Sequence, residues 1–196
     1  RASLDLCLIP EKTVIIDCDV IQADGGTRCA SITGGWLALF DALYKENHVS
    51  NEKNLNLIKR VAAISVGYIG ERLVLDLDYY EDAGCGIDLN VVMHPGLDIV
   101  EIQGTAERRT FSKSELLEMT TLAEKGIGVL FEMQKVMAQQ ISLKRLVSIL
   151  TSAMVVDISF DPVDFLRASK ISFGGVLIDL AKVDLSGIFP PSLILL

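Results

Sequence analysis

Two short stretches of this chain contain the residue types that phosphate chemistry requires. The first is Gly25-Gly26-Thr27-Arg28, which begins a segment with helical periodicity. Unpaired N–H groups at the start of a helix bind anions, glycines let the backbone approach closely, and arginine presents a planar fork of donors that suits phosphate. Gly26, Thr27 and Arg28 are therefore candidate phosphate-binding residues. An ordinary strand-to-helix turn with an exposed arginine is the alternative interpretation.

The second stretch is acidic. It runs from Asp76 to Asp82, and Asp88 follows at the start of an apolar segment. Carboxylates at the ends of neighbouring strands can converge on Mg²⁺, which takes one or two carboxylates together with water and substrate oxygens. A solvated acidic loop is the alternative for residues 76–82, but Asp88 interrupts an apolar run and is harder to explain in that way. An anion site beside a metal site predicts phosphoryl transfer without defining the reaction.

Hydrophobic periodicity predicts the elements that position these residues. Residues 13–20 alternate and predict a strand with its carboxylates on the less buried face, and residues 28–45 carry an apolar stripe at helical spacing. Four β-rich segments follow as two predicted hairpins, at 60–69, 73–77, 88–93 and 99–102. Ser112 and Glu115 have the spacing of a capping box and precede a long apolar stripe that ends near Met137. This order predicts an α/β fold in which a mixed β-sheet packs against two main helices.

The pattern changes at residue 139. Residues 139–196 are apolar without a consistent period, so we predict a catalytic portion at 1–138 and an unassigned hydrophobic tail at 139–196. The tail is either a read-through or frame-shifted product or a hydrophobic flap docked on the core, and its lack of periodicity favours the first. Residues 47–56 are polar and predict a surface loop.

Composition restricts the class of protein. Half of the residues are apolar and 22% are charged, which predicts a folded chain. A net charge of −8 argues against nucleic-acid binding by bulk electrostatics, but a local basic patch such as Lys59-Arg60 can still track an RNA backbone. The four cysteines form no C-x-x-C pair and predict reduced thiols, as in the cytoplasm. The apolar tail run at 146–156 is shorter than the ~20 residues that cross a bilayer, so no membrane association is expected.

One long motif resembles a known family. Residues 17–34 closely resemble the D-C-D-V-x-Q-A-D-G-G-T-R-x-A-S-I-T-G signature of ribonuclease PH, a family of phosphorolytic 3′-to-5′ exoribonucleases. Further matches follow in the same order at 63–67, 76–82, 88–93, 101–107 and 122–127. The resemblance covers residues 1–138 and the C-terminal portion of the family's fold. We therefore expect a ribonuclease PH-like βαβ domain that is truncated at its N-terminus.

The resemblance implies a function and a set of site residues. Family members are tRNA nucleotidyltransferases that remove nucleotides from the 3′ end of RNA, typically tRNA precursors, with inorganic phosphate as co-substrate, and release nucleoside diphosphates. Thr27 and Arg28 fall on the family's phosphate-binding positions, and Asp82 and Asp88 fall on its two essential acidic positions. The resemblance implies Mg²⁺ on Asp82 and Asp88, or Asp88 as general acid toward the leaving 3′ oxygen. It also implies a homo-oligomer, since family members form hexameric rings.

Departures from the family pattern define the alternatives. The acidic loop reads E-D-A-G-C-G-I-D where the family usually has E-D-S-A-A-E-x-D, and residues 108–110 replace a G-E-P-like turn. Together with the expected truncation, these changes suggest a non-catalytic remnant or ring subunit that assembles or binds RNA without turnover. A third hypothesis is a metal-dependent phosphoesterase that uses water and releases nucleoside monophosphates.

Overall fold

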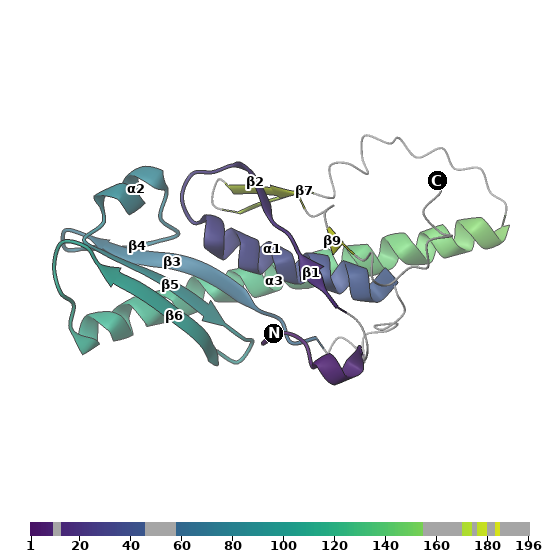
Figure 1. Ribbon diagram of the computed structural model, residues 1–196, viewed down its shortest axis with the longest axis horizontal. Coiled ribbons are helices and arrows are strands. Elements are labelled where there is room, and N and C mark those ends of the chain that lie inside the picture. Colours follow the sequence, from purple (N-terminus) through teal and green to yellow (C-terminus); the bar gives the residue numbers. More distant parts are fainter. Residues whose placement is uncertain (10–12, 46–57, 155–169, 174–175, 180–182, 185–196) are drawn as a thin grey trace.

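The main sheet has four strands and lies in the left part of Figure 1. The structure is a computed structural model that describes residues 1–9, 13–45, 58–154, 170–173, 176–179 and 183–184. The strands are β3 (Ala62–Ile69), β4 (Arg72–Leu75), β5 (Ile87–Met93) and β6 (Ile99–Ala106), in the order β4-β3-β5-β6. The predicted α/β fold is confirmed. Every strand pair among the described residues is antiparallel, where the sequence predicted a mixed sheet, because hairpins connect β3 to β4 and β5 to β6.

The two hairpins turn where the sequence places glycines. Gly70 begins the turn between β3 and β4 with a φ of 64°, and Gly96 lies in the β5–β6 turn with a φ of 93°. Both values fall in the left-handed region that glycine enters without steric cost. Both predicted hairpins are therefore confirmed.

The long helix α3 (Lys113–Met154) covers one face of the sheet. The Ser112 hydroxyl accepts from the Glu115 N–H at 3.2 Å, and the Glu115 carboxylate accepts from the Ser112 N–H at 2.8 Å, which confirms the capping box. Met119 and Ile127 of this helix are fully buried against alternate residues of β5, among them Leu89. α3 continues without a break through residue 139, so the predicted boundary falls inside a helix, and the division into 1–138 and 139–196 stays a prediction.

Helix α1 (Thr27–Lys45) packs on the opposite face of the sheet, but only at one end of it. Trp36 and Phe40 are buried and stack with ring centroids 5.6 Å apart, and they join a core cluster that includes Ala63 and Val92. The buried Gln134 of α3 links the layers, because its amide donates to the Thr33 carbonyl at 3.1 Å and to the Val61 carbonyl at 2.9 Å. The predicted α1 helix and its apolar stripe are confirmed.

The N-terminal segment differs from its prediction. A 3₁₀ helix, η1 (Leu6–Leu8), precedes two short strands, β1 (Ile15–Ile16) and β2 (Asp19–Gln22), where the sequence predicted one continuous strand with one buried face. All six strand residues are exposed, because β1 and β2 lie outside the main sheet and pack no core layer.

Part of the tail pairs with these N-terminal strands. β8 (Val176–Asp179) pairs with β2 and with β7 (Lys170–Phe173), and β9 (Val183–Asp184) pairs with β1, all in antiparallel register. The predicted loop at 47–56 lies outside the described residues. None of the helices that the structure describes has the length and hydropathy needed to span a membrane. All four cysteines are free thiols.

Candidate active site at the start of helix α1

The register of the strands places several polar side chains on the sheet face that carries α1. Asp88 and Asn90 alternate with the residues of β5 that face α3, so they point to the opposite side. Ser65 of β3 lies directly opposite Asn90, and Gln103 of β6 lies opposite it on the other side. Since α1 packs mainly at the Ala63 end of this face, these polar residues lie at the N-terminal end of the helix.

The glycine turn before α1 is held against the acidic segment. Gly25 has a φ of 83°, and a Cβ there would overlap the Leu77 carbonyl oxygen, so the position accepts only glycine. The Tyr79 N–H also donates to the Asp24 carboxylate at 3.2 Å. A Cβ on Gly26 would lie 3.9 Å from the Ser65 hydroxyl. The N-terminus of α1 is therefore fixed next to the polar end of β3.

Arg28 reaches across to the outer strand. One Nη2 hydrogen bond joins its guanidinium to the Glu101 carboxylate of β6 at 2.7 Å, and both side chains are 44% exposed. An exposed pair of this kind contributes little stability, about 0–1 kcal/mol. It does orient the guanidinium, which retains further donors for an anion. Thr27, beside it, is half-buried.

Asp82 lies on a helix that the sequence did not predict. Helix α2 (Tyr79–Gly84) begins with a capping box between Asp78 and Glu81, in which the Asp78 carboxylate accepts from the Glu81 N–H at 2.8 Å. The sequence offered this signal, since Asp78 and Glu81 have capping-box spacing, but the helix that follows is only six residues long. Asp82 is exposed on this short helix.

Asp88 is the most perturbed carboxylate of the site. Its side chain is half-buried, and its Oδ1 atom is buried with no hydrogen-bond partner among the described residues. Burial, followed by repulsion from Asp82 and Glu107, raises the pKa of Asp88 from 3.8 to about 6. The Asp82 and Asp88 carboxylates are thus close enough to repel each other. A raised carboxyl pKa at a polar surface is characteristic of functional sites.

Two residues that the sequence did not single out connect Asp88 to α1. The Cys29 thiol donates to the Asn90 Oδ1 atom at 2.8 Å, and the Asn90 amide donates to the Asp88 Oδ2 atom at 3.4 Å. Burial, with a further contribution from Asp88, raises the pKa of Cys29 to about 12, so the thiol stays protonated and remains a donor. The two-residue spacing of Asp88 and Asn90 on a strand is the signal that would have identified Asn90.

The predicted site residues therefore lie on one side of the molecule. Gly26, Thr27 and Arg28 form the start of α1, Asp88 is linked to that helix through Asn90 and Cys29, and Asp82 lies close enough to act on Asp88. His94 has a structural contact instead: its Nδ1 atom lies 2.6 Å from the Arg60 carbonyl oxygen.

The donor set fits a hard cation with few protein ligands. No group of three or more His, Cys, Asp or Glu side chains positioned to hold a metal occurs among the described residues. Mg²⁺ needs only one or two carboxylates, because it keeps several waters and binds substrate phosphates. The Oδ1 atom of Asp88, which has no hydrogen-bond partner in the described part of the chain, meets that requirement together with the exposed Asp82.

Comparison with known families addresses the same region. Residues 59–126 match the family model described as 3′ exoribonuclease family, domain 2. This segment is therefore similar to domain 2 of that family. It contains the four-stranded sheet, Asp82, Asp88 and the first turns of α3, and it agrees with a C-terminal ribonuclease PH-like segment. The start of α1, with Thr27 and Arg28, precedes the matched residues of the exoribonuclease domain.

Proposed function

We propose that this protein is a phosphate-dependent 3′-to-5′ exoribonuclease that trims the 3′ end of tRNA precursors and releases nucleoside diphosphates. One observation carries the proposal: the N-terminus of α1, with Thr27 and Arg28, is linked to Asp88 through Cys29 and Asn90, and the buried Oδ1 atom of Asp88 has no hydrogen-bond partner among the described residues. An anion site and a carboxylate pair on one surface are what phosphoryl transfer from RNA to phosphate requires.

The anion site would hold the attacking phosphate. The free N–H groups and positive dipole end of α1, the Thr27 hydroxyl and the remaining donors of Arg28 bind and orient its oxygens. A phosphate oxygen then forms a bond to the phosphorus of the terminal phosphodiester, and the bond to the 3′ oxygen of the preceding nucleotide breaks. The 3′ oxygen takes up a proton, and the terminal nucleotide leaves as a nucleoside diphosphate.

The carboxylate pair would act on the other side of the reacting phosphorus. Asp82 and Asp88 are the residues that would hold Mg²⁺, which offsets the negative charge that accumulates in the transition state. The pKa of about 6 gives Asp88 a second possible role, because a protonated carboxyl can deliver the proton that the 3′ oxygen needs.

The proposal includes a homo-oligomer, by analogy with the hexameric rings of ribonuclease PH, and a cytoplasmic location. The outer strand supports the assembly, since all eight residues of β6 are exposed and Ile99 and Ile102 expose 54% and 38% of their surface. An exposed apolar edge strand is a site that proteins normally cover.

A non-catalytic ring subunit is the second candidate. The Arg28–Glu101 ion pair favours it, because a carboxylate on the guanidinium competes with phosphate for the same donors. In this reading the chain assembles or binds RNA without turnover.

The test is product analysis. The protein is incubated with a 3′-extended tRNA precursor, Mg²⁺ and inorganic phosphate, and nucleotides are separated by chromatography. Nucleoside diphosphates that depend on phosphate, and that disappear in Asp88→Asn, support the proposal. Nucleoside monophosphates would indicate hydrolysis instead. A folded protein that binds the RNA but releases no nucleotide would leave the non-catalytic subunit as the explanation.

A further inference from the structure

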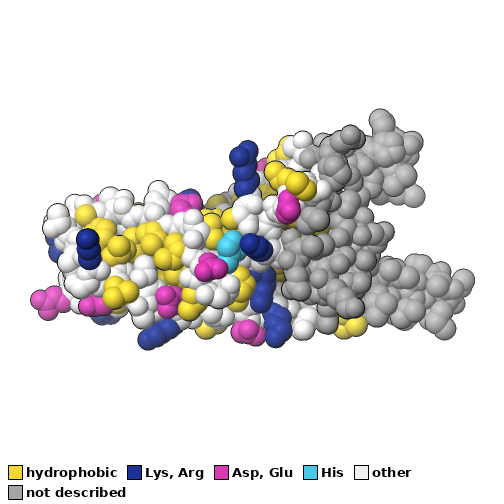
Figure 2. All heavy atoms as spheres, turned by 90° about the horizontal axis from the view of Figure 1, so that it is seen from below, with side chains coloured by type: hydrophobic (Ala, Val, Ile, Leu, Met, Phe, Trp, Pro, Cys, Tyr) yellow, Lys and Arg dark blue, Asp and Glu magenta, His cyan; other side chains and the backbone are white. Residues whose placement is uncertain are grey.

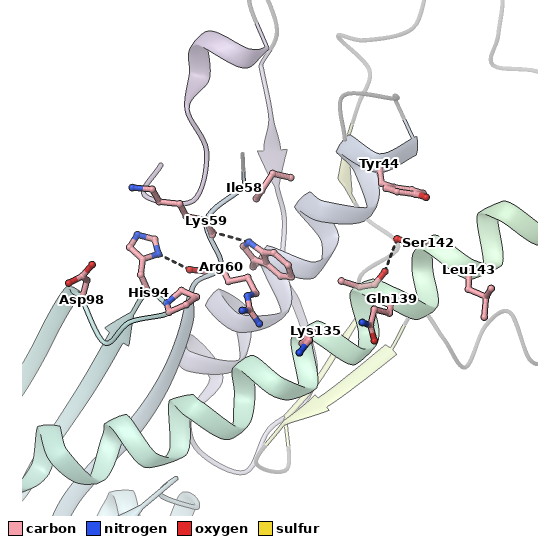
Figure 3. Close-up of a pocket in the computed structure, with 13 residues that line it drawn as sticks. Tyr44, Ile58, Lys59, Arg60, His94, Asp98, Lys135, Gln139, Ser142 and Leu143 are labelled. Carbon is pink, nitrogen blue, oxygen red and sulfur yellow. Dashed lines mark hydrogen bonds between the residues drawn. The ribbon is translucent and has the colours of Figure 1, made fainter. Parts of the chain in front are cut away.

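A cavity lies away from the candidate active site. Its volume is about 1010 Å³, and the later part of α1, the middle of α3 and the β5–β6 turn surround it (Figure 3). Three cationic side chains reach it: Lys59 and Arg60 from the segment before β3, and Lys135 from α3. Asp98 is the acidic residue among its described lining, so three positive charges and one negative charge leave +2. In a chain of net charge −8, this is a local reversal of potential.

Among the described residues, Asp98 forms no ion pair with the three cations of the cavity. Figure 3 shows Asp98 near the β5–β6 turn beside His94, whereas the side chains of Arg60 and Lys135 lie on the other side of His94, next to α3. From below, Figure 2 shows Lys and Arg side chains next to a histidine, with acidic side chains close by. The part of the cavity next to α3 therefore stays cationic.

Arg60 is held in place before any ligand arrives. Its Nη1 group donates to the Phe131 carbonyl at 2.9 Å, and its guanidinium lies 5.5 Å from the Phe131 ring centroid. The Arg60 backbone is fixed as well, through the contact of its carbonyl oxygen with His94. A guanidinium fixed in this way loses little further entropy when it binds a phosphate.

The two lysines are available to a ligand. Lys59 is exposed and makes no ion pair with any described residue, while its backbone carbonyl accepts from the Trp36 indole at 3.1 Å. Lys135 has a 3.9 Å contact with Glu132, but these side chains are 57% and 73% exposed, so water screens the pair. Both ammonium groups can therefore bind an incoming anion.

We propose that this cavity binds the phosphodiester backbone of single-stranded RNA, upstream of the 3′ end that the active site holds. The inference rests on the RNA substrate of the proposed function. The distance of the cavity from the active site favours a strand of RNA over a small phosphate compound as the ligand. Along α1, Trp36 and Tyr44 lie about 14 and 26 Å from Thr27 at 1.5 Å per residue. At ~3.4 Å per stacked nucleotide, that span corresponds to roughly four to eight nucleotides.

Charge reversal at the two lysines tests the proposal. The double variant Lys59→Glu/Lys135→Glu is compared with Lys113→Glu/Lys125→Glu, which reverses two exposed lysines of α3 outside the cavity. Each substitution changes the charge by −2, so both variants move from −8 to −12 and match in net charge. Binding of a single-stranded dodecanucleotide and of a trinucleotide is measured by fluorescence anisotropy at several salt concentrations. Inorganic phosphate and a nucleoside diphosphate serve as competitors.

The expected result is specific to the longer RNA. The cavity variant should bind the dodecanucleotide about tenfold more weakly than the control variant. The slope of the logarithm of its binding constant against the logarithm of the salt concentration should be shallower by about 1.4, because two phosphate contacts are lost. Trinucleotide binding should be alike in the two variants, because a trinucleotide fills the active site alone. Equal dodecanucleotide affinity in the two variants overturns the proposal, and so does an equal loss for both RNA lengths. Displacement of the dodecanucleotide from the cavity by free phosphate would assign the site to a small anion.

A second measurement uses the unmodified protein and does not depend on the folding of a variant. Lysine acetylation is mapped by mass spectrometry with and without the dodecanucleotide, and Lys59 and Lys135 should be protected while Lys113 is not. Full acetylation of both cavity lysines in the complex overturns the proposal. Arg28→Ala separates this inference from the proposed function, because it should abolish phosphorolysis and leave the protection of Lys59 and Lys135 intact.

Discussion

Asp88 should reduce the stability of the folded protein, and its replacement by asparagine should raise it. The carboxyl pKa is about 6 in the fold and 3.8 as the reference value. The folded state therefore binds this proton more tightly than the unfolded state does. Below about pH 3 both states are protonated and Asp88 has no effect. As the pH rises toward 6 the unfolded state ionises first, so the free energy of unfolding falls and then levels off.

The size of the effect follows from that pKa difference. A change from 3.8 to about 6 corresponds to at most ~3 kcal/mol at alkaline pH. Asp88 is only half-buried, and screening by water reduces the effect to about 1–1.5 kcal/mol. Asp88→Asn removes the ionisation while it keeps the size of the side chain. At about pH 8 the variant should unfold with a free energy about 1–1.5 kcal/mol higher, and at about pH 5 with roughly half that gain.

Urea denaturation at a series of pH values measures this difference, with Asp82→Asn as the control that removes the same charge from an exposed position. Asp82→Asn should change stability less, because it only relieves repulsion. Millimolar Mg²⁺ should stabilise the wild-type protein and leave Asp88→Asn unchanged, because ligands stabilise only the state that binds them. The reasoning is refuted if Asp88→Asn is less stable than wild type at alkaline pH, or if the difference does not vary with pH.

Three further predictions test other contacts. Glu101→Gln should lower the KM for phosphate about two- to fivefold without changing the KM for RNA, because the substitution frees Arg28 from an exposed ion pair. An unchanged KM for phosphate would mean that Arg28 is not part of the anion site. Cys29→Ala should weaken Mn²⁺ binding at least tenfold, because the variant loses the donor that orients Asn90, whereas Cys29→Ser should retain the affinity. A Mn²⁺ titration followed by electron paramagnetic resonance measures both affinities. Equal Mn²⁺ affinities of the two variants would contradict an orienting role for the Cys29 thiol. Gln134→Ala should lower the free energy of unfolding by about 3 kcal/mol, because the buried Thr33 and Val61 carbonyls lose their hydrogen-bond donor. Urea denaturation measures this change, and a loss below about 1 kcal/mol would contradict the prediction.

Local patterns in the sequence determined most of the fold. The stripe of α1, both hairpins and the Ser112 cap each depend on residues a few positions apart, and all are present in the structure. The long motif also led to the exoribonuclease family, which the match at 59–126 supports. The single strand predicted at 13–20 was wrong, because alternation implies a buried face and no core layer covers β1 and β2.

The candidate site depended more on tertiary structure. The motif identified Thr27, Arg28, Asp82 and Asp88, but it did not show that the start of α1 lies against the part of the sheet that carries Asp88. It also did not indicate Cys29 and Asn90, whose contact joins positions 61 residues apart. Periodicity reports which side of a strand or helix a residue occupies, and it carries no information about how far one layer extends over another.

The cationic cavity illustrates the same division. Lys59 and Arg60 are adjacent in the sequence and were already candidates for tracking an RNA backbone. Lys135 joins them only because α3 crosses the sheet and carries its middle turns next to the start of β3. The sequence by itself determined the elements and the chemistry of single residues. The packing of layers decided which charges share a surface, because that depends on contacts between segments far apart in the chain.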